Sequence, residues 1–123
     1  MNVKKIIFLL NFIFIAVPYC WLISIYLYFL KSIKVLNYIP TPNNPDPKIE
    51  LLKIKIGYIY NISMVLFNIG VLTFLLFIIL TIINTFISCK NNKKIIVIQY
   101  SLLVIFILIY VINPYQVIHW WFD

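Results

Sequence analysis

The side chains of this chain that could carry out chemistry are few and lie far apart. His119 and Asp123 are four residues apart, so on a helix they would share one face and could act as an acid–base pair. The segment around them holds no serine, threonine or cysteine that could serve as a nucleophile. A pair without a nucleophile or a pocket belongs much more often to a solvated face than to a catalytic site. We therefore predict that the protein is not an enzyme.

Cofactor-binding patterns are also missing from the sequence. His119 is the only histidine, so paired histidines of one chain cannot hold a haem. Gly57 and Gly70 are the only glycines and do not form a phosphate-binding loop, and no cluster of histidine, cysteine or carboxylate offers a metal site. The net charge of +7 comes from lysines that flank apolar stretches, which favours contact with anionic lipid over nucleic acid. We predict no cofactor, no metal and no nucleic-acid partner.

The most apolar part of the chain carries small and polar residues on one face, which we call the polar stripe. On a helix these residues fall within an arc of roughly 80°; they are Ser63, Gly70, Thr73, Thr81, Asn84 and Ser88. In a membrane such a stripe lets helices approach closely and hydrogen-bond to each other. The sequence leaves open whether it packs within the chain or docks on a partner. Asn61 and Asn68, one heptad apart, are expected on the opposite face.

Three apolar, charge-free stretches must position these residues. Hydrophobic residues make up 64% of the chain, whereas soluble proteins hold about 45–50%. A helix needs about 20 apolar residues to cross the hydrocarbon core. We predict an all-α membrane protein whose transmembrane helices cover residues 6–30, 60–89 and 95–112, in a single domain of residues 1–123. Most tyrosines and two of the tryptophans would fall on one side of this threading, as an aromatic belt at the membrane interface would.

The first span has two features of its own. Lys4 and Lys5 precede an apolar stretch that is too long for a cleaved signal peptide, which indicates a retained signal-anchor helix. Pro18 removes a backbone donor and predicts a kink, and Asn11 lies on the same face one heptad earlier.

A proline-rich linker is predicted over residues 31–47, because prolines occur at positions 40, 42, 45 and 47. Asp46 and Pro47 form a helix-start pattern. The sequence therefore leaves open whether residues 47–60 extend the second helix.

The pattern of residues 113–123 predicts a short interfacial helix over residues 114–122. Asn113 would cap this helix, Pro114 would take its first position, and Gln116 would complete a capping box. Its apolar residues would fall on one face, so we expect the helix to lie on the membrane surface. Three aromatic side chains are predicted as its interfacial anchors: Tyr115, Trp120 and Trp121.

Lysine counts do not decide the orientation, because the two sides of this threading hold equal numbers. The first span usually dominates, and Lys4 and Lys5 at its start favour an N-terminus on the inside.

Cys20 and Cys89 would lie about 20 Å apart in depth, too far for a disulfide within one chain. We expect a multi-pass protein of a bacterial inner or plasma membrane or of an organellar inner membrane. The composition, rich in isoleucine, asparagine and lysine, is typical of an AT-rich genome.

Together these observations favour a structural function. We expect a small accessory subunit or interaction partner within a membrane assembly, with the lipid bilayer and other membrane subunits, or copies of itself, as its partners. The alternative is a small pore-forming or holin-like toxin, or an immunity protein of the bacteriocin type. A pore would line itself with the end of the stripe formed by Thr81, Asn84 and Ser88. No motif assigns the chain to a family.

Overall fold

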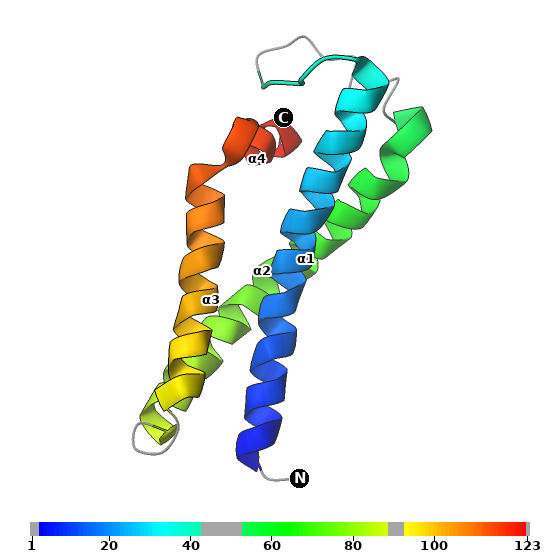
Figure 1. Ribbon diagram of the computed structural model, residues 1–123. Helices are drawn as coiled ribbons and strands as arrows, with labels where there is room; N and C mark the ends of the chain where they lie inside the picture. The colour runs from blue at the N-terminus through cyan, green and yellow to red at the C-terminus, as the bar shows by residue number, and fades with distance from the viewer. Residues whose placement is uncertain (1–2, 43–52, 89–92, 123) are drawn as a thin grey trace.

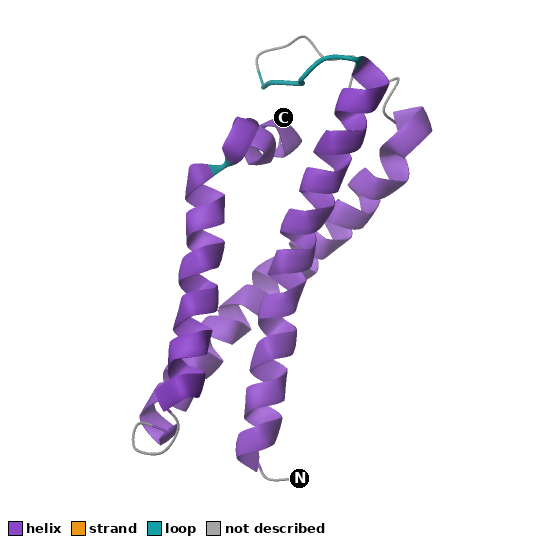
Figure 2. Ribbon diagram, in the orientation of Figure 1, coloured by secondary structure: helices purple, strands orange, loops and turns teal. Residues whose placement is uncertain are grey.

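The computed structural model describes residues 3–42, 53–88 and 93–122, and all the regular structure in these residues is helical (Figures 1 and 2). In chain order the helices are α1 (Val3–Leu36), α2 (Lys53–Ser88), α3 (Lys93–Ile112), the 3-10 helix η2 (Pro114–Gln116) and α4 (Val117–Phe122). The first three are long and apolar enough to cross a membrane. The prediction of three long apolar helices followed by a short C-terminal one is thereby confirmed.

α1 continues past the predicted end at residue 30 to Leu36 and takes up the first part of the predicted linker. Residues 31–36 contain neither proline nor glycine, so nothing in their backbone opposes a helix. The helix ends at Leu36, and the next residue, Asn37, has a left-handed φ of 60°. Its N–H donates to the Ile33 carbonyl oxygen at 2.9 Å, which completes an αL cap.

α2 begins at Lys53 and runs without a break through Gly57, so residues 53–60 extend the second helix, a point that the sequence left open. The segment Lys53–Ile56, in which lysine and isoleucine alternate, is therefore helical. The predicted helix start at Asp46 and Pro47 lies outside the described residues.

α1 and α2 form an antiparallel pair and make by far the most extensive interface of the described residues. They cross where Gly70 lies against Pro18, and α1 continues past Pro18 as one helix. α3 runs back beside the end of α2 that precedes it, and its other end leads into η2 and α4, which turn in toward α1 (Figure 1). α4 thus joins the far end of α3 to the central pair.

The inward face of α1 repeats with a period of three and four residues. The buried residues along it are Asn11, Ile15, Pro18, Leu22, Ile25, Phe29 and Ser32. This spacing averages 3.5 residues, the repeat that lets two long helices stay in contact along a gently supercoiled seam. The Asn11 amide and the Ser32 hydroxyl, at the two ends of this series on α1, are buried together with the apolar residues between them.

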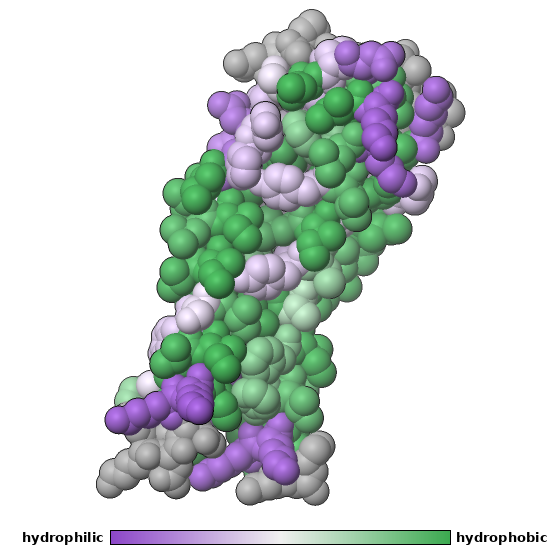
Figure 3. Space-filling view, in the orientation of Figure 1, coloured by the Kyte–Doolittle hydropathy of each residue, from purple (hydrophilic) through white to green (hydrophobic). Residues whose placement is uncertain are grey.

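On the face that Figure 3 shows, the surface of the bundle is mainly apolar between two hydrophilic ends. α3 has 20 residues, so it is about 30 Å long, close to the thickness of the hydrocarbon core. α1 has 34 residues and α2 has 36, so each measures about 50 Å. The two long helices extend past the level at which α3 ends (Figure 1).

The tail differs from the single interfacial helix predicted for residues 114–122. Tyr115 and Gln116 have φ values of 56° and 54°, which end η2 and change the chain direction before α4 begins. α4 therefore does not continue the helical phase set at Pro114, although His119 is exposed and Trp121 is buried, as the predicted faces require. Val117 and Ile118 are buried against the bundle.

Candidate helix-packing and partner site

The polar stripe of α2 faces the interior of the bundle. Five of its six members are buried, namely Ser63, Gly70, Thr73, Thr81 and Asn84. The side chain of the sixth, Ser88, lies outside the part of the chain that is described. Of the two uses that the sequence left open, the structure places these five residues in contacts within the chain.

One of these contacts lies at the crossing of α1 and α2. A Cβ built on Gly70 would lie 3.7 Å from the Cα and 3.9 Å from the N of Pro18, an ordinary van der Waals separation. Beside it, the Thr73 hydroxyl donates to the Gly70 carbonyl oxygen at 3.1 Å, which satisfies this hydroxyl within its own helix. A small residue at position 70 thus lets the two backbones approach closely.

Replacing Gly70 by alanine is expected to raise the free energy of unfolding by about 0.5–1 kcal/mol, because a methyl group fits and alanine favours a helix. Gly70→Ile adds branches at that Cβ, 3.7 Å from the Pro18 Cα, and we expect it to crowd the crossing at a cost of about 1–3 kcal/mol. Unfolding in detergent followed by circular dichroism measures both effects. Gly57→Ala, on the same helix away from the crossing, controls for helix propensity. Equal destabilisation by alanine and isoleucine at position 70 would contradict the described crossing.

Polar side chains join α2 to its neighbours further along the stripe. The Asn11 amide of α1 donates from Nδ2 to Thr81 Oγ1 at 3.1 Å, and both residues are buried. One turn later, Asn84 Nδ2 donates to Gln99 Oε1 of α3 at 3.2 Å. In hydrocarbon the alternative to such a bond is an unsatisfied amide, so the pairs favour this arrangement of the three helices at roughly 0.6–2 kcal/mol each.

Two polar atoms of these pairs remain without a hydrogen-bond partner among the described residues. They are Asn11 Oδ1, an acceptor, and Gln99 Nε2, a donor.

α1 and α3 are also joined directly, since the Tyr19 hydroxyl donates to the Leu102 carbonyl oxygen at 2.6 Å. The polar groups of this region therefore bind helix to helix.

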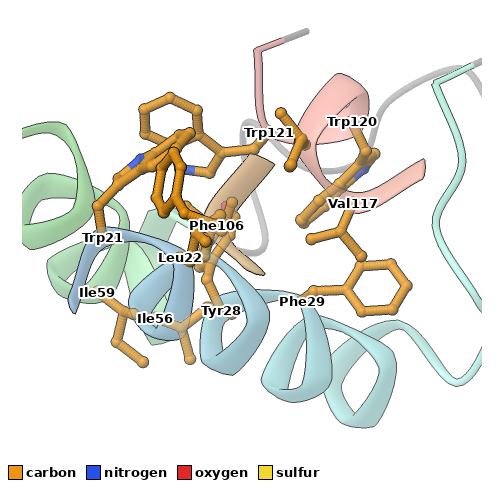
Figure 4. Close-up of a cluster of buried hydrophobic side chains, with 12 residues drawn as sticks. Trp21, Leu22, Tyr28, Phe29, Ile56, Ile59, Phe106, Val117, Trp120 and Trp121 are labelled. Carbon is orange, nitrogen blue, oxygen red and sulfur yellow. The ribbon is translucent and has the colours of Figure 1, made fainter. Parts of the chain in front are cut away.

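The tryptophans of α4 enter an aromatic cluster between α1 and α2 (Figure 4). Trp121 is only 2% exposed, and its ring centroid lies 5.7 Å from that of Trp21 and 5.6 Å from that of Phe67. Its Nε1 donates to Ser63 Oγ at 2.8 Å. Because Ser63 belongs to the polar stripe, this bond fixes α4 to α2.

Trp120 packs on the other side of the same cluster, against α1. Its ring stacks on Tyr28 with centroids 5.3 Å apart and meets Phe29 edge-on at 5.7 Å. Aromatic pairs of this geometry contribute about 0.5–1.5 kcal/mol beyond the area that they bury. The three tryptophans of the protein, Trp21, Trp120 and Trp121, thus lie in one cluster.

The predicted interfacial anchors therefore have different surroundings from one another. Trp120 and Trp121 are buried within the bundle, because the turn at Tyr115 and Gln116 directs α4 inward. Tyr115 is 70% exposed and stacks loosely over Phe29 at 6.2 Å. Of the three, only Tyr115 presents most of its ring to the surroundings of the bundle.

Asn113 holds the turn that directs α4 inward. It adopts a left-handed φ of 41° at the end of α3, and its N–H donates to the Ile109 carbonyl oxygen at 3.0 Å. Its Oδ1 accepts the Ile118 N–H at 2.9 Å, so it caps α4 instead of the helix predicted from residue 114. Its Nδ2 lies 2.7 Å from His119 Nδ1 and donates to it, which places the ring proton of His119 on Nε2.

A pocket of about 270 Å³ opens beside the helix crossing. Pro18, Gly70, Phe74 and Phe106 contribute to its largely apolar lining, together with Tyr110. Such a lining offers little to a water-soluble substrate and suits a lipid chain or an apolar side chain.

The candidate acid–base pair is not formed by described residues, because Asp123 lies outside them. His119 is exposed and bonds to Asn113. Among the residues that the structure describes, no three His, Cys, Asp or Glu side chains are grouped so that they could hold a metal ion. Cys20 is a free thiol on the exposed side of α1, and Cys89 is not described.

Comparison of the chain with protein-family models, with curated proteins and with solved structures finds no match. The candidate site therefore rests on the geometry alone.

The sequence alone does not show which residues pair with Asn11 and Gln99. Each is the only amide side chain in its predicted span, residues 6–30 and 95–112 respectively. A lone amide in an apolar span is itself a signal, because it requires a hydrogen-bond partner from another helix. The stripe on the second span contained those partners.

Proposed function

We propose that this protein is a multi-pass integral membrane protein that acts as a structural or interaction subunit of a membrane assembly. One observation carries the proposal. The polar groups of the stripe are used to hold the chain's own helices together, while the outer surfaces of α1, α2 and α3 expose large apolar side chains. Such a surface suits lipid and the helices of neighbouring membrane proteins.

The alternative of a self-assembled pore has less support. Such a pore would use Thr81 and Asn84 to line an aqueous channel, but they are 1% and 9% exposed. They bond instead to Asn11 and Gln99, so lining a pore would require the bundle to come apart.

The proposal is tested with the full chain, epitope-tagged and expressed in a host membrane. We expect the protein to remain in the membrane pellet after alkaline carbonate washing. After extraction in mild detergent, it should migrate on a native gel above the size of a single chain in detergent. Recovery from the aqueous supernatant would overturn the membrane assignment, and migration only as a single chain would overturn the assembly role. Dye leakage from liposomes that hold the purified chain would favour the pore instead.

We further propose that the N-terminus lies inside and the tail outside. Lys4 and Lys5, at the start of α1, support this orientation through the positive-inside rule. α4 and the N-terminal end of α1 lie toward opposite ends of the bundle (Figure 1). A reporter fused after Asp123 that is active only outside agrees with the orientation, and activity only in the cytoplasm reverses it.

A further inference from the structure

The outer face of α2 carries a second regular series, opposite to the polar stripe. Val65, Leu72, Ile79 and Phe86 recur every seven residues and are all exposed, Phe86 by 82%. An interleaved series begins with Asn61 and Asn68, both exposed, and continues with two further exposed apolar residues. Successive positions alternate between three and four residues apart, which is the a and d spacing of a coiled coil. We call this face the outer seam.

Asn68 is the unusual member of the outer seam. It lies well inside the candidate span Lys55–Ile87, about 20 Å along the helix from the nearer end. Its amide is exposed and has no hydrogen-bond partner among the described residues. An amide that faces hydrocarbon loses the hydrogen bonds that water would supply, so this position is unfavourable unless a partner covers it.

We propose that the outer seam pairs with the same face of a second copy of this chain, in parallel, with the Asn68 amides of the two copies hydrogen-bonded to each other. This inference rests on the proposed function, since it names the partner through which the chain enters an assembly. An amide carries both a donor and an acceptor, so two identical amides complement each other. A lipid chain offers neither group.

The alignment of the two α2 helices in the proposed dimer follows from the membrane orientation that the two copies share. Two copies inserted in the same orientation hold Asn68 at the same depth, and a two-fold axis then brings equivalent residues together. The heptad spacing keeps the remaining positions of the seam in contact on both sides of that pair. Asn61, one heptad away toward the lysine-bearing end, would meet its counterpart in the same way. The seam holds no charged residue, so pairing buries no like charges.

The pairing would leave the bundle intact. The polar stripe and the outer seam lie on opposite faces of α2, so the contacts to Asn11, Gln99 and Trp121 are unaffected. A self-association that spares the fold can be separated from misfolding in an experiment.

The first test is oxidative crosslinking of the full chain in phosphatidylcholine vesicles, in a Cys20→Ser, Cys89→Ser background. Single substitutions Val65→Cys, Leu72→Cys and Ile79→Cys are expected to form disulfide-linked dimers. Matched controls on α3, Val97→Cys, Val104→Cys and Val111→Cys, are similarly exposed, at 62%, 52% and 72%, and are expected to stay monomeric. Equal crosslinking on both helices, or none on α2, would overturn the proposal.

The second test measures association by energy transfer between labelled copies as the protein is diluted with lipid. Asn68→Leu is expected to weaken association roughly three- to tenfold, and Asn68→Gln, which keeps the amide, to retain most of it. Val104→Leu on α3 serves as the control. Unchanged helical content and tryptophan fluorescence show that the bundle is folded in each variant.

The remaining outcomes identify other occupants. If wild type stays monomeric in vesicles and Asn68→Leu raises its stability, lipid covers the seam and the proposal is wrong. If the purified chain is monomeric but migrates in a larger native complex that Asn68→Leu disrupts, a different protein occupies the seam. In that case the self-association fails while the proposed function stands.

Discussion

Replacing Trp121 by alanine is expected to lower the free energy of unfolding by about 3 kcal/mol, the usual cost of truncating a buried aromatic side chain. The indole packs against Trp21, Tyr60 and Phe67, and its N–H is bonded to Ser63. Truncation leaves a cavity between α1 and α2 and removes the hydrogen bond that fixes α4. We expect α4 to detach while the α1–α2 pair stays helical.

Two variants separate packing from hydrogen bonding at this site. Trp121→Phe keeps a ring but removes the donor, and is expected to cost about 1–2 kcal/mol. Tyr115→Ala truncates a ring that is 70% exposed and is expected to cost less than about 1 kcal/mol. Unfolding in detergent, followed by far-ultraviolet circular dichroism and by the fluorescence of the remaining tryptophans, reports all three. If Trp121→Ala costs no more than Tyr115→Ala, α4 is not packed as described.

The Asn113→Ala substitution is expected to cost about 2 kcal/mol, because it removes two stabilising features at once. Alanine is strained in the left-handed conformation, at about 1 kcal/mol, and it cannot accept the Ile118 N–H, which costs about as much again. The same change leaves His119 without its bond to Nδ2. α4 is then free to leave the orientation that buries its tryptophans.

Asn113→Gly separates the two contributions. Glycine adopts the left-handed conformation without strain, so only the side-chain bonds are lost, and about half of the destabilisation is expected. Asn37→Ala, at the corresponding left-handed position after α1, is the matched control and should leave α4 in place. Protease susceptibility of the tail together with the unfolding midpoint measures both effects. Equal costs for alanine and glycine at position 113 would show that the backbone conformation contributes nothing.

The sequence was sufficient to locate the three long helices, because each of them contains a charge-free apolar stretch long enough to cross a membrane. Their ends were less predictable, since residues 31–36 contain lysine and serine but no helix-breaking residue, and α1 simply continues into them. A charge marks where a span leaves the hydrocarbon, whereas a helix ends where the backbone is capped, here at Asn37.

The polar stripe could be placed on one face from periodicity alone, but its partners could not. Thr81 and Asn84 meet Asn11 and Gln99 because of how α1 and α3 pack, which depends on the whole bundle. The burial of Trp120 and Trp121 was not predictable either. It depends on left-handed conformations at Tyr115 and Gln116, residue types that rarely adopt them and give no signal in a sequence.

The unequal helix lengths imply that the bilayer cannot fit all sides of this molecule equally well. A membrane whose thickness matches α3 is thinner than the long axes of α1 and α2, so these two helices must tilt or push their lysine-bearing ends among the headgroups. Hydrophobic mismatch of this kind costs a fraction of a kcal/mol per ångström. In a bilayer we therefore expect the surrounding lipids to be compressed near α3 and stretched around the central pair, and the protein to favour some membrane thicknesses over others.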